Sequence, residues 1–148
     1  MLDQIQTNVV TAVLIIRIQD SEFCFDMNDI QSIINPFRTK LSYANDTKKM
    51  ISYDSTEVPI IDFASFFSLE TGSGNDKRML ILKRKKQSLS FFVDEVKELI
   101  SFNYDCEEKL SLIPGVPDSP YLIGKVYFKG KSYLFPDIEY FFNNYFPN

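Results

Sequence analysis

The chain repeats its own pattern of hydrophobic residues, and this repeat limits the folds that it can adopt. Residues 13–34 align with residues 79–100 at a constant offset of 66, so that the apolar residues 14–16 meet the apolar residues 80–82. Each copy alternates apolar and polar side chains in two runs joined by a polar turn, at 19–22 or 85–88, as paired β-strands do. Apolar residues at i, i+3 and i+4 then predict a short turn after each strand pair.

A second repeat, at an offset of 75, ends each half of the chain. The segments EVPIIDFASFF and SYLFPDIEYFF place Asp62 over Asp137, Ser55 over Gly130, and one Phe-Phe pair over another. Any two β-hairpins resemble each other, so the strands alone do not establish a duplication. Both pieces recur in the same order, however, and this order predicts two similar β units in a pseudo-symmetric pair.

The boundary between the two units is expected in the loop 68–77, where Gly, Ser, Asn and Asp cluster. The halves then cover roughly residues 11–67 and 78–143 of one domain that spans 1–148. Each half is too small to bury a good core alone, so we expect the two to pack together. The 14 Phe and 8 Tyr residues favour β structure, and the expected fold class is all-β.

Composition excludes several kinds of site. The chain has no histidine, which removes the commonest general base and the commonest zinc ligand. Its net charge of -4 disfavours binding to nucleic acid or anionic lipid. Cys24 and Cys106 are too few for a disulfide framework and are expected to be free thiols in a reducing compartment. The longest apolar run is too short for a membrane span and no signal peptide is evident, so the expected location is the cytoplasm.

Asp62 and Asp137 form a symmetric carboxylate pair, and paired carboxylates can serve a hydrolase. Each aspartate precedes a short predicted helix, where a carboxylate accepts hydrogen bonds from the free N–H groups of the first turn. We therefore interpret both residues as structural helix caps. No residue is predicted to be catalytic or to bind a metal or a cofactor, and the chain is not expected to be an enzyme.

Two aromatic or charged stretches have plain structural interpretations. The basic run 83–86 falls at a predicted hairpin tip, where charges keep a sheet edge soluble, and a partner's acidic patch is the alternative. The C-terminal IEYFFNNYFPN lacks the Lys or Arg that a membrane-surface helix needs, so we expect a short helix that covers the core. An alternative function is a small β-barrel binding module for nucleic acid, an oligosaccharide or another ligand. Binding to nucleic acid or an oligosaccharide would need a basic face studded with aromatic residues, which the net charge disfavours.

Four apolar residues lie in predicted turns with polar neighbours: Ile30 and Ile33 in the first half, and Val96 and Leu99 in the second. Core packing accounts for some of them. If the halves are pseudo-symmetric, Ile30 and Val96 come from equivalent places and can line one groove between the units. An exposed apolar groove of this kind indicates a protein or helix partner.

Three segments resemble the CheW-like family of chemotaxis coupling domains. They are VPIIDFASFF, RMLILKRKKQSLSFFVDEVKELISF and SPYLIGKVYFKGKSYLFPDIEYFF, and the resemblance covers roughly residues 11–143. It implies two SH3-like five-stranded β-barrels that share a hydrophobic core, with short helices after each barrel. It also implies a non-enzymatic cytoplasmic adaptor that couples the cytoplasmic tips of chemoreceptors to a CheA-type histidine kinase.

The resemblance further implies where these partners bind. A receptor helix would lie in a groove between the barrels, lined by Ile30, Ser32, Val96 and Leu99. The regulatory domain of the kinase, which has the same fold, would dock through the barrel ends.

The sequence departs from the family just before the Val-Pro stretch of the first half. The family has Asn-Leu-Arg-Gly there, whereas this chain has Ser52-Tyr53 followed by Asp54 and Ser55. Asp54 replaces the family's partner-contacting arginine, so we assign Asp54 and Ser55 to a partner-binding surface with a reversed charge. A CheW-like scaffold that serves a kinase outside chemotaxis is therefore an alternative to the chemotaxis adaptor.

Overall fold

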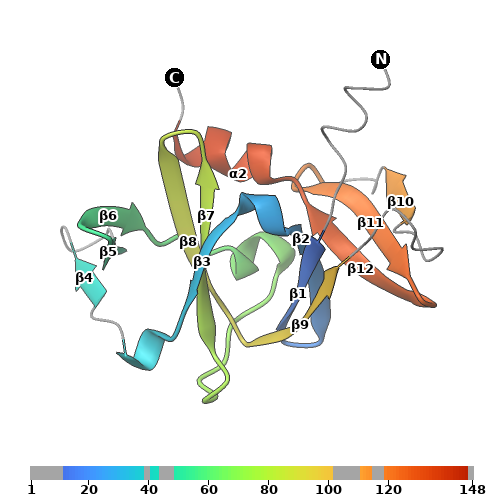
Figure 1. Cartoon of the computed structure of the whole chain (residues 1–148), viewed down its shortest axis with the longest axis horizontal. Coiled ribbons are helices and arrows are strands. Elements are labelled where there is room, and N and C mark those ends of the chain that lie inside the picture. Colours follow the sequence, from blue (N-terminus) through green and yellow to red (C-terminus); the bar gives the residue numbers. More distant parts are fainter. Residues whose placement is uncertain (1–11, 39–40, 44–48, 102–110, 115–118, 147–148) are drawn as a thin grey trace.

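The computed structural model of the chain describes residues 12–38, 41–43, 49–101, 111–114 and 119–146 (Figure 1). The first half contributes the strands β1 (Ala12–Ile18), β2 (Ser21–Asp26), β3 (Ile30–Ile34), β4 (Leu41–Tyr43), β5 (Lys49–Tyr53) and β6 (Thr56–Pro59). The second half contributes β7 (Arg78–Arg84), β8 (Gln87–Val93), β9 (Glu95–Ser101), β10 (Ser111–Pro114), β11 (Leu122–Phe128) and β12 (Lys131–Pro136). The helices are η1 (Met27–Asp29), η2 (Pro36–Arg38), η3 (Ala64–Phe67) and the C-terminal α2 (Ile138–Tyr145).

The predicted hairpins form, and they repeat with the same register. Leu14 faces Phe25 across β1 and β2, and Leu80 faces Phe91 across β7 and β8, which keeps the offset of 66. The β5–β6 hairpin turns at residues 54–55 and the β11–β12 hairpin turns at 129–130, which keeps the offset of 75. Both central residues of each of these turns have positive φ angles, the conformation that matches the twist of a tight hairpin.

The strands do not stay within their own half of the sequence. β3 pairs with β7, and β9 pairs with β1. The larger sheet has the order β10-β11-β12-β2-β1-β9, and the two smaller sheets are β3-β7-β8 and β4-β5-β6. The smaller sheets meet at a parallel bridge between Ile60 and Ser90, in the place where β12 runs parallel to β2 in the larger sheet. Each unit therefore combines strands from both halves, one unit using β3–β8 and the other using β1, β2 and β9–β12.

Two sequence-based expectations need correction. The two SH3-like five-stranded barrels are not confirmed, because among the described strands β3, β9 and β10 each pair on one side only and the sheets do not close. The short turns expected around residues 30–34 and 96–100 are strands instead. A β-bulge explains the helix-like spacing: Ile30 faces Leu82 while Ser32 faces Ile81, so one extra residue returns Ile33 to the sheet face of Ile30.

The four central strands β1, β2, β7 and β8 bury both faces, which is why they read as nearly continuous hydrophobic runs. One face contributes to a cluster that joins the two units, with Leu14, Ile16, Phe23, Phe25, Leu80, Leu82, Phe91 and residues from η3 and α2. The other face contributes to a smaller core in each unit. Val13, Ile15 and Cys24 pack within the larger sheet, and Met79 and Ile81 pack with Ile51 and Val58.

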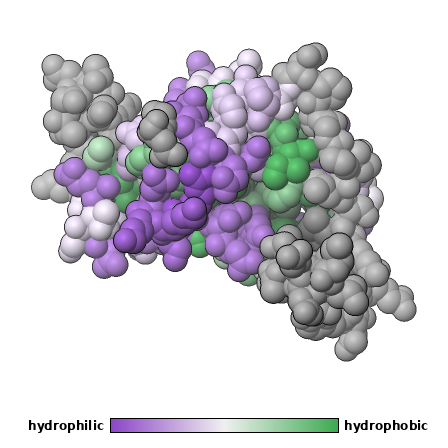
Figure 2. Space-filling model, turned by 90° about the horizontal axis from the view of Figure 1, so that it is seen from above, coloured by the Kyte–Doolittle hydropathy of each residue, from purple (hydrophilic) through white to green (hydrophobic). Residues whose placement is uncertain are grey.

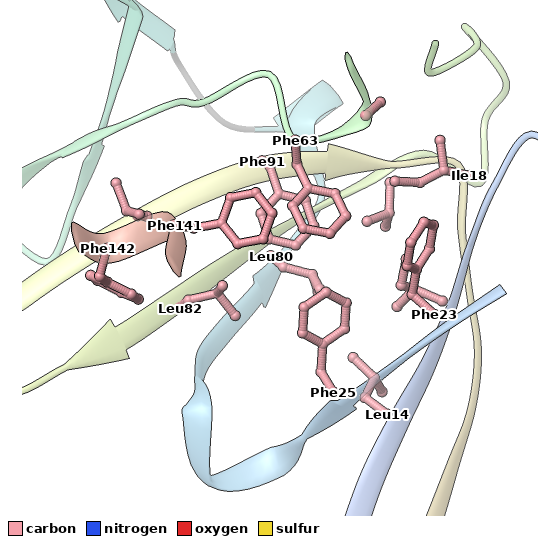
Figure 3. Packing of buried hydrophobic residues seen from close by; sticks show 14 residues of the cluster. Leu14, Ile18, Phe23, Phe25, Phe63, Leu80, Leu82, Phe91, Phe141 and Phe142 are labelled. Carbon is pink, nitrogen blue, oxygen red and sulfur yellow. The ribbon is translucent and has the colours of Figure 1, made fainter. Parts of the chain in front are cut away.

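Phe63 lies in the middle of the cluster between the units (Figure 3). Its ring stacks on Phe91 with centroids 4.3 Å apart, and it also contacts Phe23, Phe25 and Phe141 at 5.0 to 5.9 Å. The helix α2 buries Phe141 and Phe142 against the same cluster, so the C-terminal segment covers the core as predicted.

Because β3 needs β7 and β9 needs β1, we predict that neither half folds alone. Fragments 1–72 and 73–148, expressed separately, should each give poorly dispersed amide spectra, since each lacks strands that complete both sheets. Mixing them should restore the native spectrum and one cooperative melting transition. A chain cleaved in the same loop after folding is the control and should stay folded. A well-dispersed spectrum from either isolated fragment would contradict the importance of the strand exchange.

Candidate functional site

The edge strands β3 and β9 carry the residues that the sequence assigned to a partner groove. The bulge of β3 recurs in β9, where Ile16 faces Val96 while Ile15 faces Glu98. Figure 1 shows β3 beside β7 and β9 beside β1. The extra residues of the two bulges, Gln31 and Lys97, are equivalent at the offset of 66. Both units therefore end in the same kind of bulged edge strand.

Each bulge residue contacts a side chain at the equivalent position of the repeat, although one contact is a neutral hydrogen bond and the other is an ion pair. Gln31 accepts a hydrogen bond from the hydroxyl of Ser88 at 2.9 Å. Lys97 forms an ion pair with Glu22, also at 2.9 Å, and this hydrogen bond raises the pKa of Lys97. Glu22 and Ser88 are again 66 residues apart. Two bulges that the sequence analysis did not predict are thus fixed by equivalent side-chain contacts.

The bulges direct two equivalent apolar side chains toward solvent. Ile30 and Val96 are half-buried and pack against the cluster between the units. Ile33 and Leu99 follow them on the same sheet face, and their side chains are 40% and 55% exposed. We call these four residues, Ile30, Ile33, Val96 and Leu99, the edge-strand surface.

The other predicted partner-binding residues lie elsewhere. Ser32 faces Ile81, which belongs to the separate core of the β3–β8 unit, so Ser32 occupies the opposite sheet face from Ile30 and Ile33. Asp54 and Ser55 are exposed at the turn between β5 and β6, at the end of the molecule farthest from β11 (Figure 1). The structure therefore does not bring these three residues together with the edge-strand surface.

The two aspartates assigned as helix caps differ in their contacts. The Asp62 carboxylate accepts a hydrogen bond from the backbone N–H of Ser65 at 3.3 Å, in the first turn of η3. Asp137 holds the N-cap position of α2, but its side chain makes no capping hydrogen bond. The two carboxylates line different hollows, which argues against a shared catalytic pair.

A polar network that the sequence analysis missed ties three loops together. The Asp94 carboxylate accepts hydrogen bonds from the backbone N–H groups of Gln19 at 2.8 Å and Gly72 at 2.6 Å. Arg17 lies beside it and donates from Nε to Glu95 at 3.1 Å. These bonds join the β1–β2 turn, the loop 68–77 and the start of β9, so they fix the end of the edge strand from which the bulge begins. An aspartate directly after a strand is too common to predict this role.

A second polar cluster lies where η1 meets α2. Asp29, Arg84, Asp137 and Glu139 line a hollow of about 150 Å³, and Arg84 pairs with Glu139 and lies over the ring of Phe142. Burial, with the charges of Asp26 and Glu139, raises the pKa of Asp29 to about 6. The nearby tip of β7–β8 keeps Lys85 and Lys86 exposed, and Figure 2 shows hydrophilic side chains across the middle of this face.

A reactive thiol, a metal-binding cluster and a membrane-spanning helix are three further features that could give the described residues a function. Cys24 is free, as predicted. It is also buried, and its burial raises the thiol pKa to about 12. Cys106 lies outside the described residues. Within the described ranges, no three His, Cys, Asp or Glu side chains gather in a way that could hold a metal ion. No helix in this part of the chain is long and apolar enough to cross a membrane.

The pKa of Asp29 predicts how stability changes with pH. Because the pKa rises from 3.8 to about 6 on folding, the ionised carboxylate destabilises the folded protein above pH 6, and protonation relieves this cost as the pH falls toward 4. Asp29→Asn should therefore be more stable than the wild type at about pH 7.5, and the difference should shrink toward about pH 4. Urea unfolding across this range measures it, with Asp20→Asn in an exposed turn as the control. A stability difference that does not vary with pH would contradict the assignment.

The fold and its edge strands can be compared with known proteins. The solved structure of the scaffolding protein TtCheW from Thermoanaerobacter tengcongensis has a similar fold, with a TM-score of 0.69 and 17% sequence identity over 88% of this chain and 86% of that chain. No curated protein matches the sequence. The family model of the CheW-like domain matches residues 12–145, which include all the described strands and α2. The chain therefore belongs to the CheW-like domain family.

Proposed function

We propose that the chain is a non-catalytic adaptor that binds a helix of a receptor on its edge-strand surface and passes the receptor's state to a histidine kinase. The observation that carries this proposal is the equivalent exposure of Ile33 and Leu99, each next to a bulge on an open sheet edge. A chain that only needed a stable core would gain nothing from exposing the same apolar position twice. Exposed apolar side chains at a sheet edge favour a protein partner.

A helix is the partner that suits this surface. On each strand the two apolar residues have polar neighbours in the sequence, such as Gln31 on β3 and Lys97 on β9, so the apolar surface of each strand is small. An amphipathic helix binds such a small apolar surface through side chains at i, i+3, i+4 and i+7. Differential contacts in two receptor states would then change the activity of the attached kinase, with no chemistry in the adaptor itself.

Membership of the CheW-like family supports the identity of the partners. The receptor partner would be the cytoplasmic tip of a chemoreceptor, and the kinase partner the regulatory domain of a CheA-type histidine kinase. TtCheW, which shares the fold, is described as a scaffolding protein. We place the adaptor in the cytoplasm at receptor arrays, and we keep a kinase pathway outside chemotaxis as the alternative.

The β5–β6 turn is the proposed contact for the kinase. Asp54 and Ser55 are exposed there, and Glu57 on β6 adds a second negative charge. Since Asp54 stands where the family's arginine contacts its partner, attraction to a carboxylate would become repulsion. We therefore infer that the partner of this chain carries a basic group opposite Asp54.

The edge-strand surface predicts a loss of binding without a loss of folding. Ile33→Ser should weaken binding to the receptor tip by about tenfold, because it removes an apolar contact at the centre of the proposed interface. The melting temperature should hardly change, since the side chain is largely exposed. Tyr127→Ser is the matched control, because Tyr127 is also 40% exposed in a strand but lies outside this surface. Calorimetric titration with a receptor-tip fragment measures both, and equal affinities for the two variants would contradict the proposal.

The reversed charge at Asp54 predicts a change of partner. Asp54→Arg should weaken binding to the kinase regulatory domain of the same organism by about tenfold. It should improve binding to the regulatory domain of a kinase whose own CheW-like adaptor has the usual arginine. The effect should diminish as salt increases. Asp20→Arg, a charge reversal in the β1–β2 turn, is the control and should change neither affinity. If all affinities stay unchanged, Asp54 lies outside the interface.

A further inference from the structure

The two equivalent hairpins β1–β2 and β7–β8 end in turns with the same backbone shape. The register of both hairpins keeps the offset of 66, and each turn has two residues, 19–20 or 85–86. The first residue of each turn, Gln19 or Lys85, has a positive φ angle, of 50° and 54° respectively. The backbone N–H groups of these two residues therefore occupy equivalent positions at the two tips, and the tips differ in their side chains and neighbours.

Carboxylates from other parts of the chain hold the tip of β1–β2. The Asp94 carboxylate accepts a hydrogen bond from the N–H of Gln19 at 2.8 Å and lies 4.0 Å from the guanidinium of Arg17. Arg17 also pairs with Glu95. The side chain of Gln19 accepts a hydrogen bond from the N–H of Glu70 at 2.7 Å, which holds the loop between the units beside the turn. At this tip, acidic side chains bind both the turn's backbone and its cation.

The tip of β7–β8 has no such neighbours among the described residues. Figure 1 shows this tip beside α2. Three exposed lysines stand there: Lys83, at the place of the paired arginine, and the turn residues Lys85 and Lys86. None of them forms an ion pair or a cation–π contact with another described residue, and no described group accepts a hydrogen bond from the N–H of Lys85. Arg84, between them, is already paired with Glu139.

The acidic positions that hold the first tip are not repeated at the second. At the offset of 66, Asn28 corresponds to Asp94 and Asp29 corresponds to Glu95. Asn28 carries no charge, and the Asp29 side chain lines the hollow beside α2 and forms no ion pair with Lys83. The site that a carboxylate fills at the first tip is therefore filled by no described carboxylate at the second.

We propose that the β7–β8 tip binds an acidic segment of a partner protein, with one carboxylate at Lys85 in the place that Asp94 has at Gln19. This carboxylate accepts a hydrogen bond from the N–H of Lys85 and lies beside Lys83, and a neighbouring acid pairs with Lys86. Hydrogen bonds to an ionised acceptor are stronger than neutral ones. A short segment meets mainly the local positive charge, whereas the net charge of -4 would repel nucleic acid or an anionic membrane.

This proposal does not rest on the adaptor function above, and either can fail alone. The receptor helix is assigned to the edge-strand surface, which includes no residue of the β7–β8 hairpin. Lys86→Glu should therefore leave receptor-tip binding unchanged. Ile33→Ser should leave binding of the acidic segment unchanged.

The test uses the full chain and a fluorescent peptide, Gly-Asp-Glu-Gly-Glu-Asp-Gly. Anisotropy should show saturable binding that weakens with salt. Lys86→Glu should reduce the affinity by about tenfold. Lys125→Glu, at an exposed lysine of β11 in the other unit, is the matched control and should not. Equal affinities of these two variants would overturn the proposal, as would the absence of saturable binding up to about 1 mM peptide.

The amide of Lys85 reports where the peptide binds. Its proton should exchange more slowly with solvent when the peptide is present, because a carboxylate then accepts its hydrogen bond. The amide of Gln19, which Asp94 already holds, should not change. Protection of other amides without that of Lys85 would contradict the proposed geometry.

Two further measurements separate this occupant from others. A single-stranded oligonucleotide with the same charge as the peptide should bind more weakly, and tighter binding would assign the tip to nucleic acid instead. Removing residues 147–148 should leave the affinity for the peptide unchanged. A large gain in affinity would mean that the chain's own end competes for the lysines, and it would overturn the assignment to a partner.

Discussion

The aromatic cluster between the two units is the interaction on which the rest of the structure depends. Phe63 follows β6, but its ring packs against Phe23 and Phe25 of one unit and against Phe91 of the other. Phe141 closes the cluster from α2. Removing such a ring from a buried site typically costs about 3 to 5 kcal/mol. The larger sheet and the β3-β7-β8 sheet each present one face to this cluster, so neither of these two sheets is well defined without the other.

The strand exchange has a consequence for function. Since β3 leaves its own half to pair with β7, and β9 leaves its half to pair with β1, each of these strands ends a sheet. An open edge normally needs protection against unwanted pairing. Here a bulge interrupts each edge strand, and a side-chain contact holds the bulge in place. Ile33 and Leu99 follow these bulges and are exposed, so the feature that limits unspecific pairing also shapes the surface that we propose for a partner.

The sequence predicted the local part of this fold well. The hairpins at 13–26 and 79–92, with their polar turns after Ile18 and Arg84, and the core-covering C-terminal helix all follow from short-range patterns. The membership of the CheW-like family, which three segments indicated, is also confirmed.

What the sequence did not predict depends on partners far away in the chain. The spacing of Ile30 and Ile33 fits a helical turn or a bulged strand equally well, and only pairing with β7 decides between them. Strand exchange is a property of the whole topology, and no local pattern encodes it. The same applies to Asp62 and Asp137: both precede helices in the sequence, but Asp137 lies beside Arg84 and Asp29, where its carboxylate makes no capping bond.

The repeat preserves geometry more strictly than chemistry, and the differences are where specificity can arise. The bulge of β3 is held by the neutral pair of Gln31 and Ser88, whereas that of β9 is held by the ion pair of Lys97 and Glu22. The ion pair is exposed to solvent, so it contributes little to stability, and less at high salt. The turn residues Asp54 and Lys129 likewise share a position, with opposite charges. A partner that contacted both units would therefore meet the same backbone geometry twice but different charges, and this difference would favour one binding orientation over the reverse.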